Sequence, residues 1–351
     1  MKLKKSIALI SGGRGYEREI SEMSAKNLFS LIDKDRYSIF SVHIDKDGRW
    51  YISREECKKY IQFSSQREFF SEGFPSVLGG SSGIFSCGKV IPIDCAIPCL
   101  HGDFGEDGTV QGALATASIP YVGQDVYASA LTSDKIYTKL AAESLDIPTA
   151  RWIFSDGKSC ADAKREAEAK LSYPLFIKPA RLGSSYGARP VFKESEFEAA
   201  FLNAANYDGR ILIEELVEFD HELECALYDD GTRVIVPGGK ILSHGSFYDY
   251  SSKYTEAISP KTEAKTDAFT DTEKKAAKYA EALASLIGIK HLSRFDFFVT
   301  KDEKIFFNEI NAFPGMTETS LYPKLVTGIG NKHGNFINRL IDKVCCDDRR
   351  I

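Results

Sequence analysis

Short apolar runs that alternate with amphipathic stretches mark the first third of the chain. An apolar run at residues 7–10 ends in a glycine-rich turn at residues 11–15, and residues 19–32 then follow a helical period. Residues 37–44 alternate between apolar and polar positions, as a half-buried strand does. A second short apolar run covers residues 94–100. This alternation predicts an α/β fold with a mostly parallel, Rossmann-like sheet, whose ligand-binding loops lie at the carboxyl ends of the strands.

The pattern changes after about residue 125. Residues 174–178 and 211–215 predict strands that end in charged side chains, and residues 222–237 predict a strand pair around a turn. Residues 245–266 show neither helical nor strand periodicity. Long loops without a pattern are commonly functional in enzymes, so we expect a lid in this segment.

The last third of the chain contains a well-marked helix and a second strand pair. Thr270 and Glu273 form a capping-box pattern and Gly288 is a glycine stop, so a helix is predicted between them. Residues 294–300 and 304–311 predict two strands around a charged turn. The length of 351 residues exceeds one ordinary core and favours two or three domains.

Composition and charge limit the classes of partner. The net charge of -5 and the lack of a long basic block favour neither nucleic acid nor an acidic membrane. No apolar run approaches the length of a membrane span, and the one behind the basic amino terminus is too short for an export signal. The eight cysteines include no CxxC pair, which indicates free thiols in a reducing compartment. We therefore expect a cytoplasmic protein.

Two short segments near the carboxy terminus place charged residues at the spacing of a strand. Arg294 and Asp296 are two residues apart, as are Glu309 and Asn311, so each pair projects from one face of its strand. On neighbouring strands these groups would meet. Their oxygen atoms suit Mg²⁺, and the arginine would neutralise a phosphate that is being transferred. Taken alone, the segment also fits a solvated, salt-bridged sheet face.

Two further segments could hold a nucleotide. Lys178 ends a predicted strand, and residues 183–187 form a small-residue loop whose backbone amides could cradle phosphates. Glu214 ends another strand, and together with Glu222 it could bind an adenine amino group and ribose hydroxyls. The P-loop pattern GxxxxGK[ST] is absent. An ordinary turn and surface acids are the alternative interpretations of these segments.

Taken in order along the chain, these segments resemble the ATP-grasp superfamily and, within it, the D-alanine–D-alanine ligase family. The resemblance extends from Gly12 to about Pro323. Its most specific stretches are residues 12–13 with 17–21, 101–112, 183–187, 247–254 and 308–317. It implies a three-domain ATP-grasp architecture of α/β class. The implied domains are a Rossmann-like amino-terminal domain at residues 1–125, a central small domain at residues 126–215, and a carboxy-terminal domain at residues 216–351 with the metal site and a lid loop at 245–266.

The family resemblance also implies ATP between the second and third domains, with two Mg²⁺ or Mn²⁺ ions. The residues that it assigns to ATP are Lys135, Lys178, Ser185, Glu214, Glu215, Leu216, Glu222, Phe247 and Lys253. The metal ligands that it implies are Asp296, Glu309 and Asn311.

A further set of residues would handle the two amino acids, according to the same resemblance. Glu17 would bind the ammonium group of the first D-alanine, while Ser184 and Tyr254 would hydrogen-bond with Glu17 and lock the lid loop. Arg294 and the backbone N–H of Gly315 would stabilise an oxyanion. The positions that would meet the second D-alanine are His101, Ser320 and Leu321.

The resemblance implies ATP-dependent formation of D-alanyl-D-alanine for peptidoglycan precursors, through a D-alanyl phosphate. Tyr254 and Leu321 favour D-alanine as the second substrate, whereas Glu318, Thr319 and Ser252 depart from the family pattern. A ligase that joins D-alanine to D-serine, or to another D-amino acid, is therefore the first alternative. An inactive nucleotide-binding relative is the second, and the intact set of metal ligands counts against it. The expected partners are small molecules, without nucleic acid or membrane, and the resemblance implies a homodimer.

Overall fold

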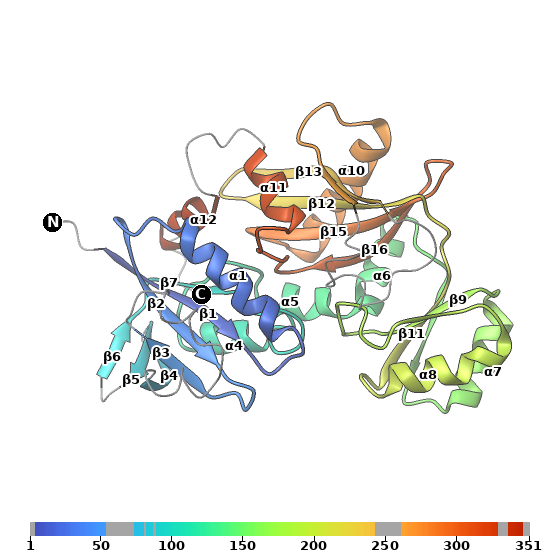
Figure 1. Cartoon of the computed structure of the whole chain (residues 1–351), viewed down its shortest axis with the longest axis horizontal. Helices are drawn as coiled ribbons and strands as arrows, with labels where there is room; N and C mark the ends of the chain where they lie inside the picture. The colour runs from blue at the N-terminus through green and yellow to red at the C-terminus, as the bar shows by residue number, and fades with distance from the viewer. Residues whose placement is uncertain are drawn as a thin grey trace.

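The computed structural model describes residues 4–53, 74–80, 82–86, 89–242, 261–328 and 336–346. Three β-sheets occupy successive stretches of this chain, and helices pack against each of them (Figure 1). In Figure 1 the amino-terminal sheet lies at the lower left, the carboxy-terminal sheet at the top, and the smallest sheet at the lower right.

The first sheet has seven strands in the order β6-β5-β4-β3-β2-β1-β7. Strands β2, β1 and β7 pair in parallel, as the apolar runs predicted, because strands buried on both faces are continuously apolar. Strands β3 to β6 extend the sheet in antiparallel fashion, so the prediction of a mostly parallel sheet is correct only for β2, β1 and β7. The bounds are β1 (Lys5–Gly12), β2 (Tyr37–Ile44), β3 (Trp50–Ser53), β4 (Phe74–Gly80), β5 (Gly83–Ser86), β6 (Lys89–Pro92) and β7 (Cys95–Pro98), with helices α1 (Arg18–Leu31) and α4 (Thr109–Thr116).

The second sheet is antiparallel, with its strands in the order β10-β9-β11-β8. Its buried apolar side chains all come from residues 153–213, so this sheet has a core of its own. The bounds are β8 (Trp152–Asp156), α7 (Cys160–Lys170), β9 (Leu175–Pro179), β10 (Arg189–Val191), the 3₁₀ helix η1 (Glu194–Glu196), α8 (Phe197–Ala205) and β11 (Arg210–Glu215).

The third sheet is also antiparallel and has the order β14-β13-β12-β15-β16. Helix α10 (Asp271–Ile287) packs on it and begins at the predicted capping box, in which Thr270 Oγ1 accepts from the Glu273 N–H and the Glu273 carboxylate accepts from the Thr270 N–H. Gly288 ends the helix in the left-handed conformation at φ 80°, as predicted. The strand bounds are β12 (His221–Asp229), β13 (Arg233–Leu242), β14 (Lys261–Ala264), β15 (Leu292–Val299) and β16 (Ile305–Asn311).

Among the described residues, helices α5 (Val126–Ser133) and α6 (Lys135–Ser144) lie between the first and second sheets in the chain, and two more helices, α11 (Leu321–Gly328) and α12 (Phe336–Cys346), follow the third sheet. After α6, Ile147 shares a hydrophobic core with Phe307 of the third sheet. Ile337 and Leu340 of α12 share a core with Ile7 of the first sheet, so the carboxy-terminal helix closes against the amino-terminal sheet.

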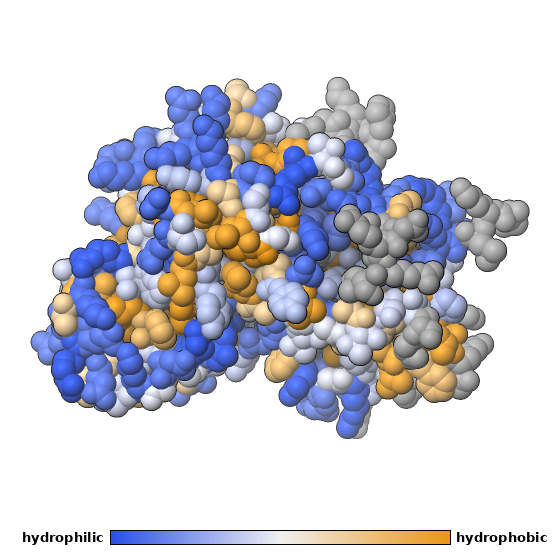
Figure 2. All heavy atoms as spheres, turned by 180° about the vertical axis from the view of Figure 1, so that it is seen from behind, coloured by the Kyte–Doolittle hydropathy of each residue, from blue (hydrophilic) through white to orange (hydrophobic). Residues whose placement is uncertain are grey.

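Figure 2 shows the face opposite to that of Figure 1, where hydrophobic side chains gather near the centre and hydrophilic residues cover most of the rim. Tyr127 of α5 is 86% exposed and Tyr137 of α6 is 50% exposed. None of the described helices combines the length and the apolar composition that crossing a bilayer requires.

Candidate functional site

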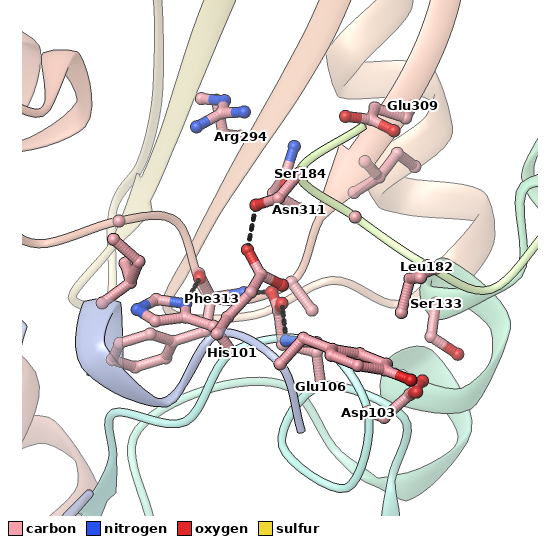
Figure 3. Close-up of a pocket in the computed structure, with 18 of the residues that line it drawn as sticks. His101, Asp103, Glu106, Ser133, Leu182, Ser184, Arg294, Glu309, Asn311 and Phe313 are labelled. Carbon is pink, nitrogen blue, oxygen red and sulfur yellow. Dashed lines mark hydrogen bonds between the residues drawn. The ribbon is translucent and has the colours of Figure 1, made fainter. Parts of the chain in front are cut away.

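A cleft of about 790 Å³ is lined by residues from all three sheet regions. Figure 3 shows Arg294, Asn311 and Glu309 on one side of it, with His101 and Glu106 on the other. The residues predicted for the site that line the cleft are Glu17, His101, Lys135, Ser184, Glu222, Arg294, Glu309, Asn311, Gly315, Ser320 and Leu321.

The two carboxy-terminal strands bring four polar side chains together. In the pairing of β15 with β16, Arg294 lies opposite Asn311 and Asp296 lies opposite Glu309. Arg294 donates two hydrogen bonds to the Asp296 carboxylate, both at 2.7 Å, and Asn311 Nδ2 donates to the same carboxylate at 3.0 Å. The convergence that the period of two predicted is therefore present in the sheet.

A third acid on this face was not predicted. Glu224 pairs with Asp296 across β12 and β15, and its Oε1 lies 3.4 Å from Nε of Arg294. Burial disfavours the charge on Arg294, but the carboxylates of Asp296 and Glu224 outweigh it and raise the pKa of the guanidinium well above its usual value. The Glu222-x-Glu224 spacing could have predicted that Glu224 joins this face, because residues two apart in β12 point to the same side of the sheet.

The oxygen atoms of this face fit a divalent cation. Asp296 is buried, Glu309 lines the cleft, and Asn311 adds an amide. Mg²⁺ is commonly held by one or two carboxylates, with phosphate oxygens and water completing its six ligands. In the part of the chain that the structure describes, no three His, Cys, Asp or Glu side chains are grouped as a metal site. The donor set thus fits an ion that shares its ligands with a nucleotide.

Two predicted lysines reach acids near the cleft. Lys135 Nζ lies 3.3 Å from Glu309 Oε2 and donates to the Leu182 carbonyl at 2.8 Å. Lys178 Nζ lies 2.6 Å from Glu214 Oε2 and donates to Asn308 Oδ1 at 3.1 Å. Glu309 and Lys135 line the cleft, whereas Lys178 and Glu214 are not among its described lining residues.

Glu214 connects Lys178 with a lysine that the sequence did not single out. Lys139 is fully buried, and its Nζ lies 2.5 Å from Glu214 Oε1. Burial would raise the pKa of Glu214, but the two ammonium groups outweigh burial and lower this pKa to about 2. Burial lowers the pKa of Lys139, and Glu214 partly offsets the effect. The carboxylate therefore stays ionised between two cations.

The small-residue loop after β9 places Ser184 next to Glu17. Ser184 and Ser185 have positive φ angles of 51° and 58°, which residues other than glycine adopt rarely. The Ser184 hydroxyl donates a hydrogen bond to the Glu17 carboxylate, drawn as the dashed line from Ser184 in Figure 3. Gly183 lies directly over this contact, because a Cβ there would be 3.3 Å from Glu17 Oε2.

Glu17 is a partly buried acid in a site with few cations around it. Burial raises its pKa, and the Ser184 hydrogen bond only partly offsets this. Among the described residues, no lysine or arginine lies within ion-pair distance of Glu17. A substrate ammonium would supply the missing positive charge, which is what the family resemblance implied for Glu17.

The loop after β16 forms the end of the cleft. Gly315, Ser320 and Leu321 line it, and a Cβ at Gly315 would lie 3.0 Å from Ser320 Oγ. Leu321 is buried at the start of α11. Glu318, which departs from the family pattern, is exposed and is not among the described residues of the lining.

The remaining predicted residues lie outside the described cleft lining or outside the described residues. Glu215 forms an ion pair with Arg151 at 3.0 Å, and the Leu216 N–H donates to the Pro174 carbonyl at 2.9 Å. Ser185 lies in the loop beside Ser184. Three predicted residues fall outside the described residues: Phe247, Lys253 and Tyr254.

Two family models match successive parts of the chain. The model described as the D-ala D-ala ligase N-terminus matches residues 6–124, and the one described as the D-ala D-ala ligase C-terminus matches residues 141–342. Together they cover most of the sequence.

Whole-chain relatives give the same family. The chain is 35% identical to the D-alanine–D-alanine ligase of Thermoanaerobacter sp. (strain X514), over 97% of this chain and 96% of the relative. It is 33% identical to that of Deinococcus radiodurans, over 97% of this chain and 98% of the relative.

Solved structures agree with these relatives. The D-alanine–D-alanine ligase from Coxiella burnetii has a TM-score of 0.84 at 29% identity and covers 97% of this chain and 94% of its own. The VanG D-Ala:D-Ser ligase from Enterococcus faecalis has a TM-score of 0.83 at 32% identity, with coverage of 97% and 98%.

Proposed function

The chain belongs to the D-alanine–D-alanine ligase family of ATP-dependent ligases, and from that premise we propose that it joins two D-alanine molecules through a D-alanyl phosphate. Its fold is the three-sheet ATP-grasp architecture expected from the resemblance. The observation that carries the proposal is the shared face of β15 and β16. Arg294, Asp296, Glu309 and Asn311 share that face, and Glu17 and Ser184 line the same cleft.

The first half of the reaction would transfer the terminal phosphoryl group of ATP. A carboxylate oxygen of the first D-alanine forms a bond to the γ-phosphorus, and the bond from that phosphorus to the bridging oxygen of ADP breaks. Glu17 would hold the ammonium group of this D-alanine, because it is a partly buried carboxylate at the cleft wall. Lys135 lies at the cleft beside Glu309, where it would neutralise phosphate charge.

Two divalent ions would be held by Asp296, Glu309 and Asn311, and when bound they neutralise the charge that develops on the phosphates. ATP would lie between the second and third sheets. We assign Lys178, Ser185, Glu214, Glu215, Leu216, Glu222, Phe247 and Lys253 to the nucleotide, as the family resemblance implies.

The second half would form the amide. The neutral amine of the second D-alanine attacks the carbonyl carbon of the acyl phosphate, and the carbonyl oxygen becomes an oxyanion. The C=O bond then re-forms as the bond from carbon to the phosphate oxygen breaks, and the proton lost by the nitrogen leaves with inorganic phosphate. Arg294 and the N–H of Gly315 both line the cleft and would donate to this oxyanion. Water must be excluded, since it would hydrolyse the acyl phosphate. We assign that task to the lid predicted at residues 245–266, where Tyr254 would join Ser184 and Glu17. Residues 245–260 of this segment lie outside the described residues, and residues 261–264 form strand β14 and not a loop.

The second substrate is proposed to be D-alanine. Leu321 is buried at the cleft and presents an aliphatic surface suited to a methyl group, and Ser320 beside it can donate to a carboxylate. D-serine is the alternative, because the VanG structure similar to this chain is described as a D-Ala:D-Ser ligase. A hydroxyl group against Leu321 would be left without a partner on that side, which favours D-alanine.

The decisive experiment supplies the protein with Mg-ATP and D-alanine alone, and then with an equimolar mixture of D-alanine and D-serine. ADP release with D-alanine alone, and D-alanyl-D-alanine as the main product of the mixture by mass spectrometry, would support the proposal. A main product one oxygen heavier would transfer the assignment to D-serine. ATP binding without ADP release in either mixture would point to an inactive relative.

We also propose a homodimer in the cytoplasm. The exposed aromatic side chains of Tyr127 and Tyr137 on α5 and α6 support an interface, because large exposed aromatic residues are enriched at contacts between proteins. Light scattering coupled to size exclusion would measure the mass, and a monomer at all concentrations would contradict the dimer.

A further inference from the structure

The segment that carries Gly315 is fastened on both sides by side chains from the amino-terminal region. Phe313 and Met316 flank Pro314 and Gly315, directly after β16. The backbone N–H and C=O of Phe313 are both hydrogen-bonded to side chains from before residue 107, and so are those of Met316. We call the four side chains that make these bonds the amino-terminal clamp; they are Ser24, Asn27, His101 and Glu106.

Glu106 joins two loops through its carboxylate. Its Oε1 accepts from the Phe313 N–H at 2.8 Å, and its Oε2 accepts from the Gly102 N–H at 2.9 Å. Burial and repulsion from Glu17 raise the pKa of Glu106 to about 7, and the two N–H groups oppose this rise. Figure 3 shows Glu106 below Ser184, with His101 and Phe313 beside it. The Glu106 carboxylate is held in position because both of these partners are backbone N–H groups.

His101 hydrogen-bonds to Phe313 and connects it to helix α1. Its Nδ1 lies 3.1 Å from the Phe313 carbonyl oxygen, which can only accept, so Nδ1 carries the proton. Its Nε2, 3.1 Å from Ser24 Oγ, then accepts from the serine hydroxyl. Burial lowers the pKa of His101 to about 4, which keeps the ring neutral and this tautomer available. Both ring nitrogens are therefore used by the protein.

Helix α1 holds the other end of the segment. Ser24 Oγ accepts from the Met316 N–H at 3.2 Å, and Asn27 Nδ2 donates to the Met316 carbonyl at 2.6 Å. Ser24 and Asn27 are three residues apart and so project from the same face of α1. Pro314 has no N–H, and among the described residues no group accepts from the Gly315 N–H. The Gly315 N–H is thus the one backbone donor of residues 313–316 that the described residues leave without an acceptor, and Gly315 itself lines the cleft.

We propose that the amino-terminal clamp positions the Gly315 N–H for the oxyanion, and that His101 acts through Phe313 instead of touching the second substrate. The inference deepens the proposed ligase activity and rests on it. Its physical basis is that an oxyanion donor works only when fixed in place beforehand, since misplacement by about 1 Å can cost about a hundredfold in rate. The clamp fixes the loop of the third sheet to the region that binds the first D-alanine.

Asn27→Ala is the sharpest test, because Asn27 bonds Met316 and is not among the described residues that line the cleft. We expect kcat/KM for D-alanine to fall by about tenfold to a hundredfold. Affinity for a phosphinate analogue of the dipeptide, whose tetrahedral phosphorus imitates the oxyanion intermediate, should fall by a similar factor. The Kd for ADP should stay within about twofold, because the clamp does not touch the predicted nucleotide residues. Glu106→Gln should lower kcat/KM and phosphinate affinity in the same way. Its amide NH₂ would face one of the two backbone N–H groups and could not accept a hydrogen bond from it.

Asn338→Ala is the matched control. Asn338 of α12 also fastens the α1 region to a carboxy-terminal helix, by accepting from the Asp33 N–H at 3.1 Å, but among the described residues none of its hydrogen bonds reaches residues 313–316. It should lower the melting temperature without changing affinity for the phosphinate. Unchanged kcat/KM in both Asn27→Ala and Glu106→Gln would overturn the clamp, and so would a loss of ADP and phosphinate affinity in equal measure. A wild-type chain that releases no ADP with D-alanine would instead overturn the proposed function, and the clamp with it.

Discussion

The Ser184 hydroxyl donates a hydrogen bond to the Glu17 carboxylate, although 167 positions separate the two residues in the chain. Glu17 directly precedes α1 of the amino-terminal region, and Ser184 lies in the loop after β9 of the smallest sheet. Their contact joins the predicted ammonium site to the predicted phosphate loop. Because burial raises the pKa of Glu17, the bond also helps to keep this acid ionised for a substrate ammonium.

Glu17→Gln is expected to weaken binding of the first D-alanine. Loss of a charge-assisted hydrogen bond costs about 1.5–3 kcal/mol, so KM for the first D-alanine should rise by roughly tenfold to a hundredfold. Initial rates across D-alanine concentration measure this effect. Glu22→Gln makes the same charge change at a residue of α1 that is not among the described lining of the cleft. It should leave KM unchanged. An equal rise in both variants would remove Glu17 from the ammonium site.

Glu309→Gln is expected to abolish most turnover while the fold survives. The change removes a charged oxygen ligand beside Asp296, and the loss of one strong electrostatic group in an active site costs roughly 10²–10³ in kcat. Rates should be followed against Mg²⁺ concentration, together with the melting temperature. Glu303→Gln, at the exposed turn before β16, serves as the control. Near wild-type turnover in Glu309→Gln would refute the metal assignment.

Gly315→Ala is expected to impair catalysis through crowding. A Cβ would lie 3.0 Å from Ser320 Oγ, so the loop or Ser320 must shift by a few tenths of an ångström. We expect kcat to fall by about tenfold, since small misplacements of catalytic groups are costly. Gly209→Ala places its Cβ in open space and should be neutral. Equal kcat values for the two variants would show that catalysis does not depend on the close approach of the Gly315 backbone to Ser320.

The buried Glu214 predicts a stability change in acid. Its pKa in the folded protein is about 2, below the ordinary value of 4.5. A depressed pKa means that ionised Glu214 stabilises the fold fully above about pH 4.5, and that this stabilisation is lost as pH falls toward 2. Urea unfolding between pH 6 and pH 2 should therefore show a pH dependence in this window.

Glu214→Gln should remove that part of the pH dependence. At neutral pH it should also destabilise the protein by about 3–5 kcal/mol, because Lys139 and Lys178 would lose their shared buried counter-ion. Glu215→Gln changes the neighbouring acid, whose ion pair with Arg151 is partly exposed, and gives the comparison for a surface pair. A pH profile identical to the wild type in Glu214→Gln would contradict the strong depression of its pKa.

The sequence by itself determined the local elements and which side chains share a face. The period of two in a strand is a property of the backbone, so Arg294 with Asp296, and Glu309 with Asn311, were placed correctly before any pairing was known. The capping box at Thr270 acts within one helical turn and was equally predictable. The order of these segments along the chain then indicated the family.

Only the tertiary structure decided which distant segments meet. Nothing local in the sequence marks Glu106 as the acceptor for Phe313, or Lys139 as the buried partner of Glu214. Such contacts arise when separately folded sheets and helices pack, and they depend on the position of every intervening element. Helix α12 closes on the first sheet for the same reason: its apolar face must be buried, but a hydrophobic pattern does not name the surface that buries it.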